Sequence, residues 1–159
     1  MRVILIDENN RILIANYGNI ILLPGGKVDE GETNLIAITR ELSEEIGCNY
    51  SVEELEFFTT LKFYQKNYPT RNGKLKNRLI TTHYFVGKYK GISRQSLTEK
   101  EQKDNFRLEL VSLEDIENII LNNKNSNPRN IYFQKELLTI LTCYKKTKQN
   151  ISVKKLKLK

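Results

Sequence analysis

Residues 23–48 read LPGGKVDEGETNLIAITRELSEEIGC, and the rest of the chain is arranged around them. The proline and two glycines at 24–26 end any preceding strand, and a second polar loop follows up to Thr33. A helix is predicted to begin there, because the Thr33 hydroxyl can accept a hydrogen bond from a free amide of the first turn. No Gly or Pro occurs again before Gly47, where we expect the helix to end.

Three glutamates lie on one side of this predicted helix. Glu41, Glu44 and Glu45 are spaced i, i+3 and i+4, so their carboxylates fall within an arc of roughly 100°. The only base in the helix is Arg40, and a divalent cation is one species that would neutralise the clustered charges. On the three glutamates alone, the favoured explanation is a solvated acidic face with an Arg40–Glu44 pair, which contributes roughly a few tenths of a kcal/mol. An adjoining apolar stripe, which can pack against a sheet, consists of Leu35, Ile38, Leu42 and Ile46.

The spacing of the whole stretch decides between these explanations. Its fixed positions are Gly26, then Glu32 after five residues, then Arg40, Glu41 and Leu42 after seven more, then Glu44, Glu45 and Gly47. This pattern resembles the signature box of the Nudix hydrolases, and it arises by chance in on the order of one chain in ten million. The departure is Cys48, where the family usually has an aliphatic residue. A buried cysteine is a small hydrophobe, so we expect no functional consequence.

The resemblance implies an α/β fold, namely a Nudix-type α/β/α sandwich around a mixed sheet. It also implies hydrolysis of a diphosphate linked to another moiety, often a nucleoside, with Mg²⁺ or Mn²⁺ as cofactor. Bridging cations neutralise transition-state charge and lower the pKa of a bound water. The implied ligands of the cation are the Gly25 carbonyl, Glu41, Glu44 and Glu45. Arg40 would orient the glutamates, and Glu32 would brace the loop against the helix.

The box does not assign the carboxylate that takes the proton from the attacking water. A glutamate of the box is one candidate. The others, Glu99, Glu101 and Asp104, lie in a predicted loop at 95–105, just before an apolar strand at 106–111. Glu101 ranks first among them because of its distance from that strand, although a solvated charged loop explains all of them. The predicted catalytic residues are therefore Arg40, Glu41, Glu44 and Glu101.

Two β-rich segments at 55–65 and 78–89 should lie beside the metal-binding helix, with a turn at Asn72-Gly73 between them. Polar and aromatic residues toward that turn could meet a base or a sugar; they are Tyr64, Tyr68, Arg71, Lys74, Asn77 and Arg78. Of these we predict Tyr64 and Arg78 as substrate-binding residues, together with Lys27 beside the glycine loop. Core packing and a solvated hairpin tip are the alternative. His83, the only histidine, is expected to be a packed or hydrogen-bonded strand residue.

The remaining elements follow from local patterns. Strands are predicted at 2–7, 11–15 and 20–23, and a short helix capped by Ser112 at 112–122. A last helix is predicted to begin at Asn127 and Pro128 and to end near residue 146, with an apolar stripe over the second face of the sheet. A homodimer formed through that stripe is the alternative.

Composition indicates one globular domain at 1–146, followed by a basic tail at 147–159. The chain has 159 residues and a net charge of +7, and residues 145–159 hold seven lysines and no acid. The rest carries 19 bases and 19 acids, so we expect a solvated tail and no nucleic-acid partner, and loose binding of RNA or an anionic surface by the tail is the alternative. No apolar run is long enough for a membrane span, and the start does not read as a secretory signal. Cys48 and Cys143 are far apart, so we expect a cytoplasmic protein without disulfides.

The compact chain with LPGGK looks most like the MutT-like branch of the family. That branch implies hydrolysis of a nucleoside triphosphate, including oxidised ones, to the monophosphate and pyrophosphate. A dinucleoside polyphosphate or a nucleotide sugar is the alternative substrate, with Tyr64 and Tyr68 in its favour. A hypothesis of another class is a nucleotide-binding module without catalysis. Such modules usually lose box glutamates, and all three are present here.

Overall fold

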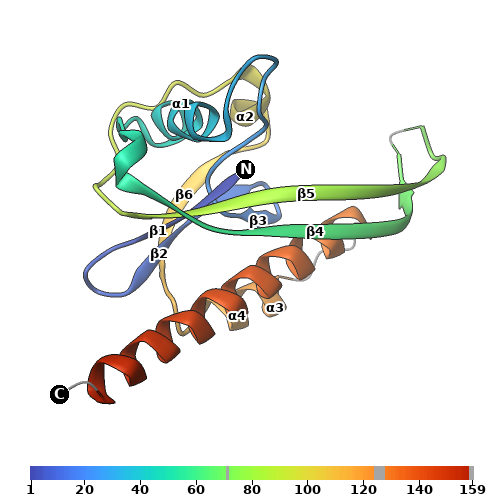
Figure 1. Ribbon diagram of the computed structural model, residues 1–159. Helices are drawn as coiled ribbons and strands as arrows, with labels where there is room; N and C mark the ends of the chain where they lie inside the picture. Colours follow the sequence, from blue (N-terminus) through green and yellow to red (C-terminus); the bar gives the residue numbers. More distant parts are fainter. Residues whose placement is uncertain (71, 124–127, 158–159) are drawn as a thin grey trace.

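The structure is a computed structural model that describes residues 1–70, 72–123 and 128–157, and Figure 1 shows its layers. The strands are β1 (Arg2–Ile6), β2 (Arg11–Tyr17), β3 (Ile20–Leu22), β4 (Leu55–Pro69), β5 (Leu75–Lys88) and β6 (Arg107–Ser112). The helices are α1 (Asn34–Ile46), the 3₁₀ turn η1 (Val52–Glu54), α2 (Glu99–Lys103), α3 (Ile116–Asn122) and α4 (Pro128–Lys157).

The strands form one mixed sheet in the order β3-β2-β1-β5-β4, with β6 also paired to β2. β1 and β5 run parallel, with Arg2 opposite Tyr84, and the other pairs are antiparallel. β4 and β5 form a long hairpin that extends past the end of α1 (Figure 1). This parallel pair places β5 beside β1, and the start of β1 lies against the glycine turn, since the Val3 N–H donates to the Pro24 carbonyl at 3.0 Å.

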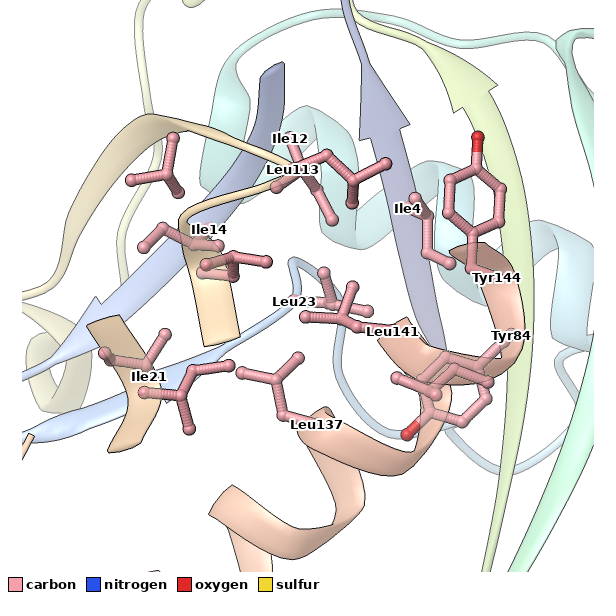
Figure 2. Packing of buried hydrophobic residues seen from close by; sticks show 14 residues of the cluster. Ile4, Ile12, Ile14, Ile21, Leu23, Tyr84, Leu113, Leu137, Leu141 and Tyr144 are labelled. Carbon is pink, nitrogen blue, oxygen red and sulfur yellow. The ribbon is translucent and has the colours of Figure 1, made fainter. Parts of the chain in front are cut away.

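Alternating side chains of the central strands build two cores, one on each face of the sheet. Val3 and Leu5 of β1 pack toward α1, whereas Ile4 packs toward α3 and α4. The α1 core consists of Met1, Val3, Leu5, Leu13, Ala37, Ile38, Leu42, Ile46, Tyr50, Leu55 and Phe85. Figure 2 shows the other core, where Leu137 and Leu141 of α4 lie against Ile4, Ile21 and Leu23. The predicted α/β/α sandwich around a mixed sheet is therefore confirmed.

Local signals placed most element boundaries correctly. Thr33 caps α1 by accepting the Ile36 N–H at 3.3 Å, and Gly47 ends the helix with φ +74°. The turn at Asn72-Gly73 closes the β4–β5 hairpin, whose strands extend beyond the predicted ranges. The predicted cap Asn127 and the candidate Arg71 lie outside the described residues.

Three predicted elements differ from the structure. The loop expected at 95–105 contains the helix α2, because Thr98 and Glu101 form a capping box. α3 begins at Ile116 and not at residue 112, because Ser112 supports a turn before it: its hydroxyl accepts the Glu114 N–H at 3.2 Å. α4 continues to Lys157, past the predicted end near residue 146, since nothing in the Lys-rich sequence breaks a helix. None of the helices within the described ranges is both long enough and apolar enough for a bilayer span.

Candidate functional site

The glycine turn between β3 and α1 requires residues without a side chain at two positions. Gly25 has φ +126°, and a Cβ there would lie 2.6 Å from the Met1 carbonyl oxygen. A Cβ on Gly26 would lie 2.1 Å from a carboxylate oxygen of Glu41. The turn therefore lies directly against both the first strand and the acidic flank of α1.

Glu45 ties α1 to this turn. Its side chain is buried, and its carboxylate accepts the Gly25 N–H at 2.8 Å and the Tyr17 O–H. Burial raises the pKa of Glu45 to about 7, although both hydrogen bonds and the nearby charge of Arg2 act to lower it. A cation beside this carboxylate would favour its ionised form.

Arg40 binds several oxygens around the loop. Its guanidinium contacts Glu32 at 2.8 Å, Glu41 at 3.2 Å and Glu44 at 3.4 Å, and it donates to the Lys27 carbonyl at 3.2 Å. The hydrogen bonds from Arg40 lower the pKa of Glu32 to about 2. The predicted loop brace and the predicted Arg40–Glu44 pair thus exist as contacts, and one guanidinium joins loop and helix.

The remaining acidic charge suits a hard divalent cation. Glu41 has a raised pKa, first because it is half-buried, and the charge of Glu44 acts in the same direction. In the ranges that the structure describes, no three acidic, histidine or cysteine side chains are gathered closely enough to enclose an ion. The oxygens of Glu41, Glu44, Glu45 and the Gly25 carbonyl are nevertheless the donor type that Mg²⁺ and Mn²⁺ take, and they come from two adjoining segments.

Arg2 is a member of the site that sequence reasoning missed. Its guanidinium donates to the Leu23 carbonyl at 2.8 Å and to the Gly25 carbonyl at 2.5 Å. Burial raises the pKa of both Glu41 and Glu45, and the positive charge of Arg2 opposes that rise in each. The only signal in the sequence is a charged residue at the start of an apolar strand, which by itself indicates nothing about the glycine turn.

A cleft of about 580 Å³ opens beside the turn, between β5 and α4. Its lining includes Arg2, Gly26, Lys27, Val28, Asn34, Arg78, Ile80, Thr82, Tyr84, Phe133, Glu136 and Leu137. The structure therefore brings two of the predicted substrate-binding residues, Lys27 and Arg78, to one cavity. Tyr64, the third, is 55% exposed and is not among the residues that line this cleft.

Arg78 is held in a defined position at the cleft. Its guanidinium carbon lies 3.4 Å from the centre of the Tyr68 ring, and its Nε donates to the Gln65 Oε1 at 2.5 Å. Both neighbours are almost fully buried. The face of the Tyr68 ring therefore supports the Arg78 guanidinium, and this ring is not available to stack on a ligand.

Glu136 is a second residue that the sequence did not reveal. Its Oε1 accepts the Thr82 hydroxyl at 2.7 Å and the Tyr84 hydroxyl at 2.6 Å. These bonds fix a carboxylate of α4 against β5 in the wall of the cleft. The helix pattern predicted which face of α4 is apolar, but it did not predict which strand residues that face meets.

Glu101, predicted as a catalytic residue, has a structural role in α2, and its catalytic role stays a prediction. Its carboxylate accepts the Thr98 N–H at 2.7 Å and the Thr98 hydroxyl at 2.8 Å, which caps α2. Burial is the first cause that raises the pKa of Tyr17, whose hydroxyl bonds Glu45, and the charges of Glu45 and Glu101 act in the same direction. Glu101 is thus engaged in the cap of α2, while Glu99 and Asp104 are exposed at the two ends of α2.

The other candidates lie on the β4–β5 hairpin. His83 shares a 2.9 Å hydrogen bond between its Nδ1 and the Thr60 hydroxyl. Asn77 accepts the Asn67 N–H at 3.0 Å near the hairpin tip, where Lys74 is exposed. These contacts support the hairpin itself, as expected for His83.

Comparisons with known proteins identify the family and the fold of the chain. The NUDIX domain model matches residues 1–134. The 8-oxo-dGTP diphosphatase of Escherichia coli (strain K12) is 44% identical over 61 aligned residues, which cover 32% of this chain and 47% of that protein. The chain thus matches about half the length of this curated relative.

Two solved structures have the same fold. The MutT protein of Bacillus halodurans has a TM-score of 0.53 at 21% identity, over 74% of this chain and 69% of that one. A NUDIX hydrolase from Nitrosomonas europaea has a TM-score of 0.56 at 15% identity, over 84% and 83%. At these identities the likeness concerns the fold alone. Because the family model covers most of its length, the chain belongs to the NUDIX domain family.

Proposed function

We propose that this chain hydrolyses a diphosphate linkage in a nucleotide with Mg²⁺ or Mn²⁺ as cofactor. The substrate that fits best is a nucleoside triphosphate, including an oxidised one, which is cleaved to the monophosphate and pyrophosphate. One observation carries the proposal: the 580 Å³ cleft opens at Gly26 and Lys27, where the turn meets Glu41. Phosphates held by Lys27 would therefore lie beside the carboxylates of α1.

The cation and the side chains of the protein would have separate roles in the reaction. A cation held by Gly25, Glu41, Glu44 and Glu45 would supply charge neutralisation and an acidified water. Arg40 orients the carboxylates of Glu41 and Glu44 through its contacts at 3.2 and 3.4 Å. Arg40 is therefore a positioning residue.

We place the proton acceptor in the box. The Glu44 side chain is 38% exposed, against 13% for Glu41, so water reaches Glu44 most readily. Glu101 accepts two hydrogen bonds from Thr98, both on its Oε2, which hold its side chain in place as the cap of α2. Glu44 is therefore favoured over Glu101 as general base.

The part of the cleft away from the glycine turn suits a nucleobase that has both hydrogen-bond donors and acceptors. Arg78 offers donors there and Glu136 offers a carboxylate, and both line the cavity. The name of the Escherichia coli relative, 8-oxo-dGTP diphosphatase, makes an oxidised purine nucleotide the first substrate to test. The alternative, a dinucleoside polyphosphate or nucleotide sugar, loses support because Tyr64 lies outside the cleft lining and Tyr68 is buried under Arg78.

Product analysis with Mg²⁺ tests the function. The panel comprises nucleoside triphosphates with and without an 8-oxo group, dinucleoside polyphosphates and nucleotide sugars. We expect pyrophosphate plus monophosphate from a triphosphate, and Glu44→Gln should lower kcat by about 100-fold or more. Glu53→Gln, which removes an exposed carboxylate on η1, is the matched control and should leave kcat unchanged.

Other products would change the assignment. Two phosphorylated fragments released faster from a linked diphosphate would favour the dinucleoside or sugar substrate. No cleavage of any compound, with equal nucleotide binding by the parent and Glu44→Gln, would show a binding module.

A further inference from the structure

Arg2 forms a hydrogen bond with the Gly25 carbonyl oxygen, which is one of the proposed ligands of the cation. Its Nη1 donates to the Gly25 carbonyl at 2.5 Å and to the Leu23 carbonyl at 2.8 Å. One nitrogen thus bridges two carbonyls of the glycine turn. The charge of this guanidinium also opposes the rise that burial causes in the pKa of Glu41 and Glu45. Arg2 therefore places positive charge on the carbonyl oxygen that the cation would bind.

A divalent cation and this guanidinium would repel each other at Gly25. A carbonyl oxygen has two lone pairs, so geometry alone permits two partners. Mg²⁺ binds oxygen at about 2.1 Å, so with the Arg2 nitrogen in place the two positive charges would lie within about 5 Å of each other. Like charges at that separation, in a site partly shielded from water, favour one occupant at a time.

We propose that Arg2 is an internal counter-ion, and that the cation displaces it from the Gly25 carbonyl into the adjoining cleft. This inference rests on the proposed function, from which it takes the cation site. Arg2 already lines the cleft together with Lys27, so the released guanidinium can reach a phosphate without a change in the main chain. A guanidinium binds phosphate oxygens through two parallel hydrogen bonds. Cation and nucleotide binding are then coupled through one side chain.

The direct test is NMR of the whole chain during a Mg²⁺ titration without nucleotide. The signals to follow are the Gly25 carbonyl carbon, the Arg2 side-chain nitrogens and the carboxyl carbons of Glu41 and Glu45. We expect all of them to shift over the same range of Mg²⁺ concentration. The Arg2 signals should move toward those of a solvent-exposed arginine, because its two carbonyl partners are lost.

Variants test whether Arg2 competes with the cation for the Gly25 carbonyl. The affinity for Mn²⁺ is measured from the electron paramagnetic resonance signal of the free ion. Arg2→Met removes the competitor and should bind Mn²⁺ about fivefold tighter or more. Arg2→Lys keeps a charged donor and should stay within about twofold of the parent. Arg11→Met is the matched control, because it removes the same charge from an exposed arginine that pairs with Asp7 at 2.8 Å. Thermal unfolding of each variant verifies that it is folded.

The outcomes separate this inference from the proposed function. If Mg²⁺ shifts Glu41 and Glu45 but leaves Arg2 and Gly25 unchanged, Arg2 is only a brace of the turn, and the inference fails alone. The same holds if Arg2→Met binds Mn²⁺ no tighter than Arg11→Met. If Mg²⁺ shifts none of these signals, the cation site and the inference fail together.

Discussion

The bond between Glu32 and Arg40 makes the stability of the loop depend on pH. Hydrogen bonds from Arg40 lower the Glu32 pKa to about 2 in the folded chain, against about 4.3 in an unfolded one. A carboxyl with a lowered pKa contributes stability that is fully present above its unfolded pKa and is lost as the pH falls through its folded pKa. The pair lies near the surface, so solvent screening keeps this contribution small.

Glu32→Gln should therefore lower the melting temperature at neutral pH by an amount that shrinks as the pH falls from about 4 to about 2. The measurement is thermal unfolding of parent and variant across that range. Glu53→Gln changes an exposed glutamate of η1 and should show little difference at any pH. A melting-temperature difference for Glu32→Gln that stays constant with pH would assign the effect to lost geometry and not to charge.

Residues of the box could be predicted because their spacing carries the information. The contacts of Arg40 with Glu32 and Glu44 follow from a loop and a helix that are adjacent in sequence. Arg2 and Glu136 could not be predicted in this way. Each contacts partners that are more than 20 residues away in the sequence, because strands pair or a helix packs on the sheet. A local sequence pattern does not predict such contacts.

Among the elements, the turn and α1 act as one unit, and Gly26 is the point of closest approach. Gly26→Ala would place a methyl group 2.1 Å from the Glu41 carboxylate, which must move away. We expect Mn²⁺ affinity and kcat to fall by about tenfold or more, because the support of a ligand is lost. Thermal stability should change little, since the clash is with the end of a flexible side chain.

The control for this loop is Gly31→Ala. Gly31 has φ +85°, and no atom lies within 4 Å of a Cβ built there. The substitution should cost about 1 kcal/mol of backbone strain and leave Mn²⁺ affinity unchanged. Equal effects of both substitutions on Mn²⁺ affinity would mean that loop conformation, and not the Glu41 position, controls the site.

Element boundaries were predictable where a cap or a breaker marks them. Thr33 and Gly47 delimit α1 as expected. The capping box of Thr98 and Glu101 is equally local, so α2 could have been found from sequence by the same rule. α4 is different: its Lys-rich end has no breaker, and the apolar stripe alone does not mark where the helix ends.

On the scale of the whole molecule, the sheet separates two hydrophobic cores that support different parts of the site. The core under α1 supports the acidic flank, and the core under α3 and α4 supports the far wall of the cleft. The division follows from strand geometry, because neighbouring residues of β1 face opposite sides of the sheet: Val3 and Leu5 join one core and Ile4 the other. The cleft itself depends on how α4 docks on β5, which strand and helix patterns do not specify.

This division predicts that stability and cation binding can be changed separately. Leu141 is fully buried in the core shown in Figure 2, on the face opposite α1. Leu141→Ala should lower the free energy of unfolding by about 2–5 kcal/mol, measured by urea denaturation. Leu121→Ala, at a position that is 66% exposed, should change it by less than about 0.5 kcal/mol. Mn²⁺ affinity of the folded Leu141→Ala protein should equal that of the parent, because no α1 ligand contacts this core. A weaker Mn²⁺ affinity would instead show that packing of α4 is transmitted through the sheet to Glu45 and the glycine turn.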